Sequence, residues 1–583
     1  MRFRNENKNV SVQAIAGTHV VLLGLNATET SAKGLLGFTV SRRKDGTGHF
    51  QPLSGGRNFE GIESSLPVLQ TFLWGDYTVD AASHYTYRVT PLYGMPDIPE
   101  AGEHVDVEVT TENPEQGKHG IYFNRGVAGS QAYSRKFGEY RKWYRKSPTE
   151  KDIEKIRFTQ YVKPEDVPDR QAYVWLSRGL EEAMLRFIGQ ASGPEYSLRA
   201  AVYEFTHGPV IQAFVDALEA GVDVKIVHHA KADDIYKEAL KAVGKVGISN
   251  PASLDGFRQM LIPRHSQTIS HNKFIVLLKG GKPLQVWTGS TNFTAGGIYG
   301  QSNVGHIVRD EAIAAKYVEY WQRLSADPKA ADLSTANVSR QVDLKGAPRP
   351  NSITAIFSPR TTEAMLDWYV DRQNTARQSV FLTLAFGLAQ QLFKGVTEPK
   401  KISKTAPFLR YLLLEDKNDV RVKPKFPAMV DCPQNRVAWG ELLKKRKGET
   451  AQDTLVETLT GLNDHVSFLH TKYLLIDPLS DDPIVITGSA NFSSNSTTAN
   501  DENMLVIRGD TRVADIFLGE FMRLFNHFRY RNESNALFNG AAEVNFLRPD
   551  DSWTQRYYTA GTHEYAERLL FGYEIAAARS AAR

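Results

Sequence analysis

The sequence contains a single cysteine, Cys432, among 583 residues. One thiol excludes an internal disulfide and a cysteine-rich zinc site. No apolar stretch reaches the ~18–20 residues of a membrane span, and the start, MRFRNENKNV, holds no apolar run of signal-peptide length. We therefore expect no integral membrane span and a cytoplasmic location, although export by a leaderless route would leave the same sequence.

A strong excess of one charge is also missing, because the formal net charge is only +4. So weak a balance neither requires nor excludes a polyanionic partner. The remaining composition, 41% hydrophobic and 23% charged residues, is ordinary for a folded protein. The length predicts about two to four domains.

One short segment occurs twice, at a constant offset of 199 residues (470 − 271 = 199). The first copy runs from His271 to Asn292 and the second from His470 to Asn491. Each copy has the pattern of a β-hairpin, in which His and Lys open one strand and Ser and Asn end the other. Because the two ends of a hairpin lie side by side, each copy should gather four polar side chains. They are His271, Lys273, Ser290 and Asn292 in the first copy, and His470, Lys472, Ser489 and Asn491 in the second.

Helix and strand patterns alternate around each copy. In the first half we expect a helix over 176–190, a strand over 197–205, a helix over 210–220 and a strand over 222–227. This order predicts a parallel sheet covered by helices, and its return in the second half predicts a pseudo-twofold core. We expect an α/β protein with a first lobe over 113–345 and a second over 346–583, the latter ending in a helical tail.

Residues 1–112 are strand-rich and precede these lobes. The segment 85–93 alternates aromatic or apolar with polar residues, which is typical of a half-buried strand. Together with 72–77 it weakly resembles the later strands of fibronectin type III-like sandwiches. We expect a small accessory β-sandwich domain, which offers a possible contact for a protein partner.

Two basic segments have two interpretations each. Residues 130–150 interleave bases and aromatic rings, a pattern that can follow a nucleic-acid backbone or form a surface helix whose rings face the core. The cluster over 444–447 suits either a polyanion or a solvated loop.

The duplicated form H-x-K, with G-S-x-N starting sixteen residues after the Lys, resembles the phospholipase D superfamily. That superfamily includes phospholipases D, cardiolipin synthases, metal-independent nucleases and tyrosyl-DNA phosphodiesterases. The resemblance covers about 175 to 530. It implies two phospholipase D-like α-β-α lobes that face each other, with both histidines in one site.

The residues themselves suit attack on a phosphodiester. One neutral imidazole can attack phosphorus and form a phosphohistidine, while the other, as imidazolium, protonates the leaving oxygen. Lys273, Lys472, Asn292 and Asn491 can donate to the phosphate oxygens, and Ser290 and Ser489 can donate or orient. Two lysines supply the charge that a metal would otherwise bring, so we expect no cofactor and no metal ion.

The family pattern also distinguishes the two histidines. The offset aligns Asn303 with Glu502, at a position where members often carry a carboxylate that reaches the other half's His. The resemblance thus implies that Glu502 orients His271 and Asn303 orients His470. Since a carboxylate stabilises the cation formed on phosphorylation, we expect His271 as nucleophile and His470 as general acid and base.

The first copy departs from the usual motif, which has Asp five residues after the Lys. Asp477 fills this place in the second copy as an expected supporting residue, but Leu278 fills it in the first. Two classes of function therefore stay open. One is a phosphodiesterase acting on phospholipid or nucleic acid. The other is a catalytically retired fold that serves as a binding or scaffold protein.

Overall fold

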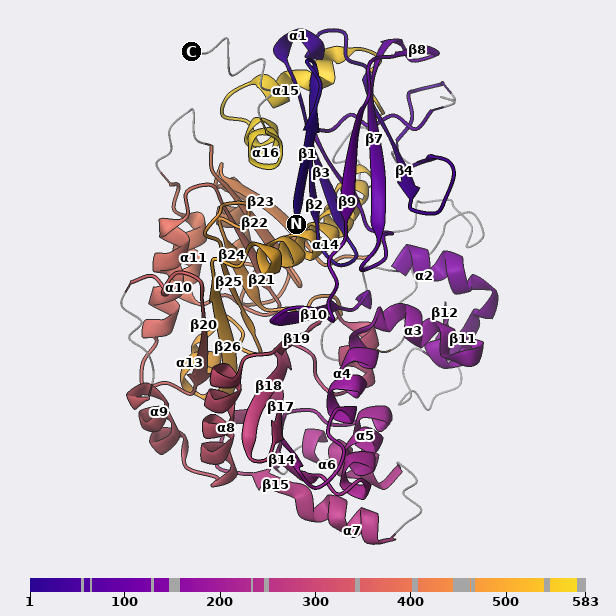
Figure 1. The fold of residues 1–583 in the computed structure, drawn as a ribbon. Coiled ribbons are helices and arrows are strands. Elements are labelled where there is room, and N and C mark those ends of the chain that lie inside the picture. Colours follow the sequence, from indigo (N-terminus) through magenta and orange to yellow (C-terminus); the bar gives the residue numbers. More distant parts are fainter. Residues whose placement is uncertain are drawn as a thin grey trace.

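The computed structural model describes the chain apart from twelve segments, eleven of them internal and one at the end. These are 54–56, 63–65, 127–129, 146–157, 232–233, 246–250, 341–345, 401–406, 444–461, 463–466, 539–545 and the end, 574–583. The basic cluster 444–447 therefore lies outside the described residues. Figure 1 shows an N-terminal β-rich domain packed against two α/β lobes, as the strand patterns predict.

The N-terminal domain consists of two antiparallel sheets that share one apolar core. The first sheet has the order β1 (Arg2–Glu6), β2 (Val10–Ala16), β3 (Val21–Ala27) and β6 (Leu73–Asp76). The second has the order β5 (Gln51–Pro52), β4 (Gly37–Lys44), β7 (His84–Met95) and β8 (Ile98–Ala101), and β9 (Val105–Thr110) also pairs with β7. The alternating segment predicted as a strand is β7, whose Tyr85, Tyr87 and Val89 are buried in the core. The closer likeness to fibronectin type III stays a prediction.

The first lobe is built on a seven-stranded sheet. Its strand order is β10 (His119–Phe123), β19 (Val304–Val308), β18 (Lys282–Gly289), β17 (Lys273–Lys279), β13 (Tyr196–Val202), β14 (Asp223–His229) and β15 (Leu261–Arg264). Neighbouring helices are α4 (Leu180–Gly189), α5 (Gly208–Glu219) and α8 (Glu311–Ser325). β13 pairs in parallel with β14, and β17 and β18 form the first predicted hairpin.

The second lobe repeats this plan. Its main strand order is β16 (Ile269–Ser270), β26 (Asn500–Arg508), β25 (Ile484–Gly488), β24 (Tyr473–Ile476), β21 (Ser379–Leu384), β22 (Leu409–Leu414) and β23 (Asn435–Trp439), and β20 (Ser352–Ser358) also pairs with β26. β21 pairs in parallel with β22, and β24 and β25 form the second hairpin. The pseudo-twofold repeat of an α/β unit is thereby confirmed, while the domain boundaries stay a prediction.

One predicted helix is wrong in its extent. The helix expected over 176–190 is two helices, α3 (Gln171–Ser177) and α4, separated by Arg178 and Gly179. Both residues have left-handed backbone angles, with φ of 52° and 92°. Glycine adopts this conformation at little cost, so Gly179 is where the chain turns.

The long helix α14 (Thr511–Phe538) joins the domains. Figure 1 shows it running between the N-terminal sheets and the lobes. Its apolar residues enter a core shared by both lobes, and its Glu520 forms a buried ion pair with Arg178 at 2.9 Å. The tail helix α16 (His563–Phe571) contacts β3 of the N-terminal domain. The N-terminal domain is therefore packed into the body of the protein.

Candidate active site

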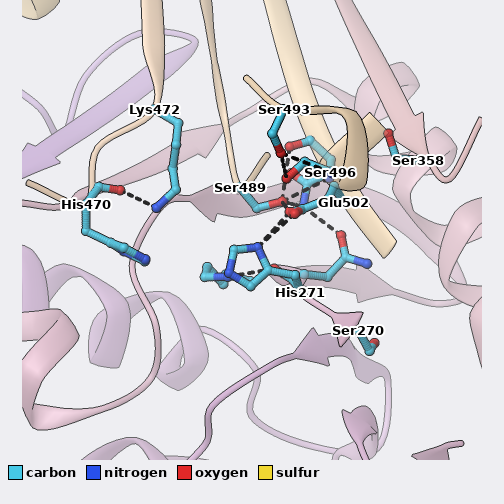
Figure 2. A network of polar contacts seen from close by, with 12 residues as sticks. Ser270, His271, Ser358, His470, Lys472, Ser489, Ser493, Ser496 and Glu502 are labelled. Carbon is cyan, nitrogen blue, oxygen red and sulfur yellow. Dashed lines mark hydrogen bonds and ion pairs between the residues drawn. The ribbon is translucent and has the colours of Figure 1, made fainter. Parts of the chain in front are cut away.

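The two hairpins bring the repeated polar side chains to one place between the lobes. His271 lies two residues before β17, and Ser290 directly follows β18. In the second copy, His470 lies three residues before β24, and Ser489 directly follows β25. Figure 2 shows His470 and Lys472 across from His271, Ser489 and Glu502. The two sets are close enough for each histidine to respond electrostatically to both lysines.

Each of the two motif histidines is anchored to the opposite lobe through its backbone. The N–H of His271 donates to the carbonyl of Asp501 at 3.0 Å, and the N–H of His470 donates to the carbonyl of Ser302 at 3.1 Å. The short strand β16, just before His271, pairs with β26 of the second lobe. Leu469 forms the corresponding bridge to Ser302. Neither half of the site can therefore form from one lobe alone.

On the first side, a buried carboxylate faces the imidazole. Nδ1 of His271 lies 2.9 Å from both carboxylate oxygens of Glu502. The Ser489 hydroxyl donates to the same carboxylate at 2.7 Å. Burial, followed by the charges of Lys273 and Lys472, holds the pKa of His271 well below its usual value. A neutral His271 that donates from Nδ1 has its Nε2 lone pair free.

Glu502 itself is fully buried. Burial raises its pKa to about 7, although Lys273 and the Ser489 hydroxyl favour the charged form. The carboxylate therefore changes charge near neutral pH. When it is ionised it accepts from Nδ1 of His271, and when it is protonated it becomes a donor to the same atom.

On the second side, an amide takes the place of the carboxylate. Nδ1 of His470 lies 3.0 Å from Oδ1 of Asn303, which also accepts from the Ser290 hydroxyl at 2.8 Å. The Asn303 amide group donates to the carbonyl of Gly297 at 2.8 Å, which fixes its orientation. Burial and the lysine charges lower the pKa of His470 as well. A neutral amide orients this ring without adding a negative charge.

A residue outside the repeat holds Asn303 in place. Asn124, directly after β10, accepts from the backbone N–H of Asn303 at 2.9 Å. Its amide also donates to the carbonyls of Ile298 and Gln301, both at 2.7 Å. Asn124 is fully buried, so these contacts are shielded from water. Sequence reasoning missed it because it lies far from the duplicated segment.

The two lysines have matching contacts. Each Nζ donates at 2.6 Å to the carbonyl of the histidine two residues earlier. Burial lowers the pKa of Lys273 to about 8, against the opposing effect of Glu502. Burial and Lys273 also lower the pKa of Lys472. Burial disfavours the charged form of both lysines, and Lys273 also repels Lys472. A phosphate bound beside them would favour their charged forms.

One aromatic ring flanks each histidine. Tyr203 lies edge-on to His271, with 4.9 Å between ring centroids, and Phe386 lies edge-on to His470 at 6.1 Å. Each ring also contacts the lysine of its own lobe. Tyr203 directly follows β13, and Phe386 lies two residues after the end of β21.

The two asparagines of the motifs differ in their surroundings. Asn292 donates from Nδ2 to the carboxylate of Glu204, a second carboxylate that the sequence interpretation did not single out. Among the described residues, Oδ1 of both Asn292 and Asn491 is buried without a hydrogen-bond partner. Glu204 follows Tyr203 after β13, and it favours the charged form of both lysines.

The structure does not bring Asp477 to the site. Its carboxylate accepts three backbone N–H groups, from Arg377, Gln378 and Ser379, at 2.7–2.9 Å. It therefore fixes the start of β21, at the end of β24 that lies away from Lys472. The expected supporting role beside the catalytic groups is wrong in this respect. Leu278, at the same place in the first lobe, is buried in the apolar core.

The basic and aromatic segment divides between core and surface. In α2 (Ser130–Phe137), Tyr133 and Phe137 are buried and pack against Trp175. Trp143, on β11 (Lys142–Arg145), is 67% exposed. The core interpretation is therefore correct for two of the rings, while Trp143 remains available at the surface.

Family comparison agrees with the repeated motif. The model of the family described as "Cardiolipin synthase, PLD-like domain" matches residues 184–325 and 411–525, one segment in each lobe. Over these two segments the chain is similar to the phospholipase D superfamily. Comparison with curated proteins finds no match.

Several solved structures are similar to this chain, and three of them follow. A polyphosphate kinase from Porphyromonas gingivalis shares 12% identity over 58% of this chain, with a TM-score of 0.35, and the chain spans only 46% of that protein. The phospholipase D family member Nuc from Salmonella typhimurium shares 25% identity over 25% of this chain and 86% of its own, with a TM-score of 0.21. Phosphatidylserine synthase from Haemophilus influenzae shares 11% identity over 61% of this chain and 85% of its own, with a TM-score of 0.40.

Two features are not found in the described part of the chain. None of its helices is long and apolar enough to cross a membrane. Within the same residues, no group of three or more His, Cys, Asp or Glu side chains could hold a metal ion.

Proposed function

We propose that the protein is a phosphodiesterase that cleaves its substrate through a covalent phosphohistidine. The observation that carries the proposal is the unequal environment of two otherwise equivalent histidines. His271 faces the carboxylate of Glu502, and His470 faces the amide of Asn303. Such a pair suits a nucleophile on one side and a general acid on the other.

In the first step, Nε2 of His271 attacks phosphorus and the bond to the leaving oxygen breaks. His470 gives its Nε2 proton to that oxygen, so the leaving group departs as a neutral alcohol. Glu502 accepts the Nδ1 proton of His271 in a hydrogen bond and stabilises the positive charge of the phosphorylated ring. The substrate's own negative charge offsets the two lysines and favours the protonated His470.

In the second step, His470 takes a proton from water, and the water oxygen attacks phosphorus. The P–N bond breaks and returns His271 to its starting form. An alcohol in place of water would give transfer instead of hydrolysis. Lys273, Lys472 and the amide groups of Asn292 and Asn491 are the donors for the phosphate oxygens in both steps. The two lysine charges serve the electrostatic role of a metal ion.

Phospholipid and nucleic acid both remain candidate substrates. The exposed Trp143 beside Lys142 favours nucleic acid, because a ring and a cation at the surface can bind a base and a phosphate. The match to the cardiolipin synthase family model favours a phospholipid. We propose 1–112 as an accessory domain, 113–345 as the first lobe and 346–583 as the second.

A retired site is the alternative, with the protein acting as a scaffold. The buried Leu278 does not support it, because Asp477 at the matching position contacts only backbone away from the histidines. The absence of an Asp in the first copy therefore removes no group from the proposed chemistry.

The test is turnover of bis(4-nitrophenyl) phosphate in EDTA by wild type and by His271→Ala, followed by phosphatidylcholine and single-stranded DNA. We expect metal-independent turnover that the substitution abolishes while the protein stays folded. In parallel, His470→Ala should slow esters with poor leaving groups more than esters with good ones. No turnover of any of the three substrates would favour the scaffold function, and complete inhibition by EDTA would contradict the mechanism.

A further inference from the structure

Three backbone N–H groups just before His470 converge on one carboxylate. Glu415, directly after β22, accepts from Ser467 at 2.9 Å, from Phe468 at 3.1 Å and from Leu469. These three residues lead directly into His470. The carboxylate therefore holds the segment that carries the proposed general acid.

The same segment is enclosed on its other sides. The carbonyl of Phe468 accepts from the N–H of Ser302 in the first lobe at 2.9 Å. A Cβ added at Gly440 would lie 2.5 Å from the Phe468 ring and 2.4 Å from the Glu415 carbonyl oxygen, so glycine is required there. The Phe468 ring packs against Phe528 of α14. Neighbouring groups thus confine the segment, and Glu415 supplies the acceptors for its N–H groups.

The first lobe has the same arrangement with a different residue. β13 and β14 pair Val202 with His228, as β21 and β22 pair Leu384 with Leu414. In the first lobe, His229 directly follows His228, and in the second lobe, Glu415 directly follows Leu414. Nδ1 of His229 lies 3.3 Å from the N–H of Ser270, the residue before His271. Corresponding positions of both lobes therefore contact the backbone that leads into a catalytic histidine.

We propose that Glu415 is a positioning residue for the general acid, which holds residues 467–469 so that Nε2 of His470 points at the leaving oxygen. This inference rests on the proposed function. It extends that function to a residue that contacts none of the reacting groups. A carboxylate suits the task because two oxygens with several lone pairs can accept from three donors at once.

The effect should be selective for one step. His271 is held by Glu502 through its ring and by Asp501 through its backbone, and neither contact involves Glu415. Loss of the Glu415 carboxylate should therefore disturb proton donation more than nucleophilic attack. A good leaving group needs little protonation, so the defect should depend on the leaving group.

The experiment compares Glu415→Gln with wild type on ethyl phenyl phosphate and ethyl 4-nitrophenyl phosphate. Glutamine keeps the shape but points an NH₂ group at backbone donors. We expect kcat to fall about tenfold or more for the phenyl ester, and about threefold or less for the nitrophenyl ester. The matched control is Asp416→Asn, because Asp416 is the next residue, is exposed, and accepts from the backbone N–H of the nearby Asn418. It should leave both rates unchanged.

The nitrophenyl ester also reports whether the variant is folded, since its turnover needs the whole site. An equal loss on both esters, or no loss on either, would overturn the positioning role while leaving the proposed function standing. Absence of turnover by wild type would remove the proposed function and this inference together. As a contrast, His229→Ala acts on the nucleophile's side and should slow both esters alike.

Discussion

Replacement of Glu502 by glutamine tests the central hydrogen bond of the site, between Glu502 and His271. The Ser489 hydroxyl donates to Oε2 of Glu502, and Nδ1 of His271 lies against both oxygens. In the Glu502→Gln variant, Ser489 can keep its acceptor only if the amide oxygen faces it. The NH₂ group then takes the place of Oε1, 2.9 Å from Nδ1 of His271, while the amide oxygen stays at the place of Oε2. Nδ1 thereby loses the negative charge that holds its proton and gains a competing donor, which favours the tautomer with a proton on Nε2, and this tautomer cannot attack phosphorus.

The expected loss is large and depends on pH. Loss of the Glu502 carboxylate, which accepts the Nδ1 proton of His271, should lower kcat/KM about 10²–10⁴-fold. In wild type, Glu502 must be ionised for His271 to carry its proton on Nδ1. Because burial raises the pKa of Glu502 to about 7, kcat/KM should rise with pH through about 7. The variant should lack this rise.

The assay is kcat/KM for bis(4-nitrophenyl) phosphate across neutral pH in EDTA. Burial also raises the pKa of Glu415 to about 7, so the Glu415→Gln profile is the control. For Glu415→Gln, kcat/KM should rise with pH at the same midpoint as for wild type. The reasoning is refuted if Glu502→Gln keeps its rate within about threefold, or if its acid limb persists at the wild-type midpoint.

Two further changes separate the phosphate-binding groups from the structural ones. Burial lowers the pKa of Lys273 to about 8, so kcat/KM of wild type should fall above about pH 8 as this cation is lost. The Lys273→Gln variant should lack this fall at high pH, and its kcat/KM should be lower than that of wild type at every pH. A limb that survives in Lys273→Gln would assign it to another group. Asp477→Ala removes the acceptor of three N–H groups and should cost about 1–3 kcal/mol of unfolding free energy by thermal or urea melts, with kcat within about threefold. A large fall in kcat without a change in stability would instead place Asp477 in the chemistry.

The duplicated motif carried most of the prediction. A constant offset places equivalent residues in equivalent hairpins, so the grouping of His271 with Lys273, and of His470 with Lys472, could be deduced from spacing. The same offset aligned Asn303 with Glu502. The expectation that both groups meet in one site, and that Glu502 and Asn303 reach the opposite histidines, came from the resemblance to the family.

The residues that sequence reasoning missed come to the site by long-range pairing. Asn124 arrives on β10 through its pairing with β19, and Glu415 through the parallel pairing of β22 with β21. Neither has a motif of its own, and their roles depend on which backbone groups the fold leaves unpaired. Asp477 shows the opposite error. Its place in the motif predicted a place beside the site, but its carboxylate binds the backbone N–H groups at the start of β21.

The anchoring of each histidine on the opposite lobe has a consequence for the nascent and the damaged protein. A single lobe exposes a histidine and a lysine but lacks the residue that orients the ring and the carbonyl that holds its backbone. On the proposed mechanism, reactivity therefore requires both halves to be synthesised, folded and docked. The seam between the lobes would then act as an assembly checkpoint, because a fragment that holds only one lobe lacks part of each histidine's surroundings.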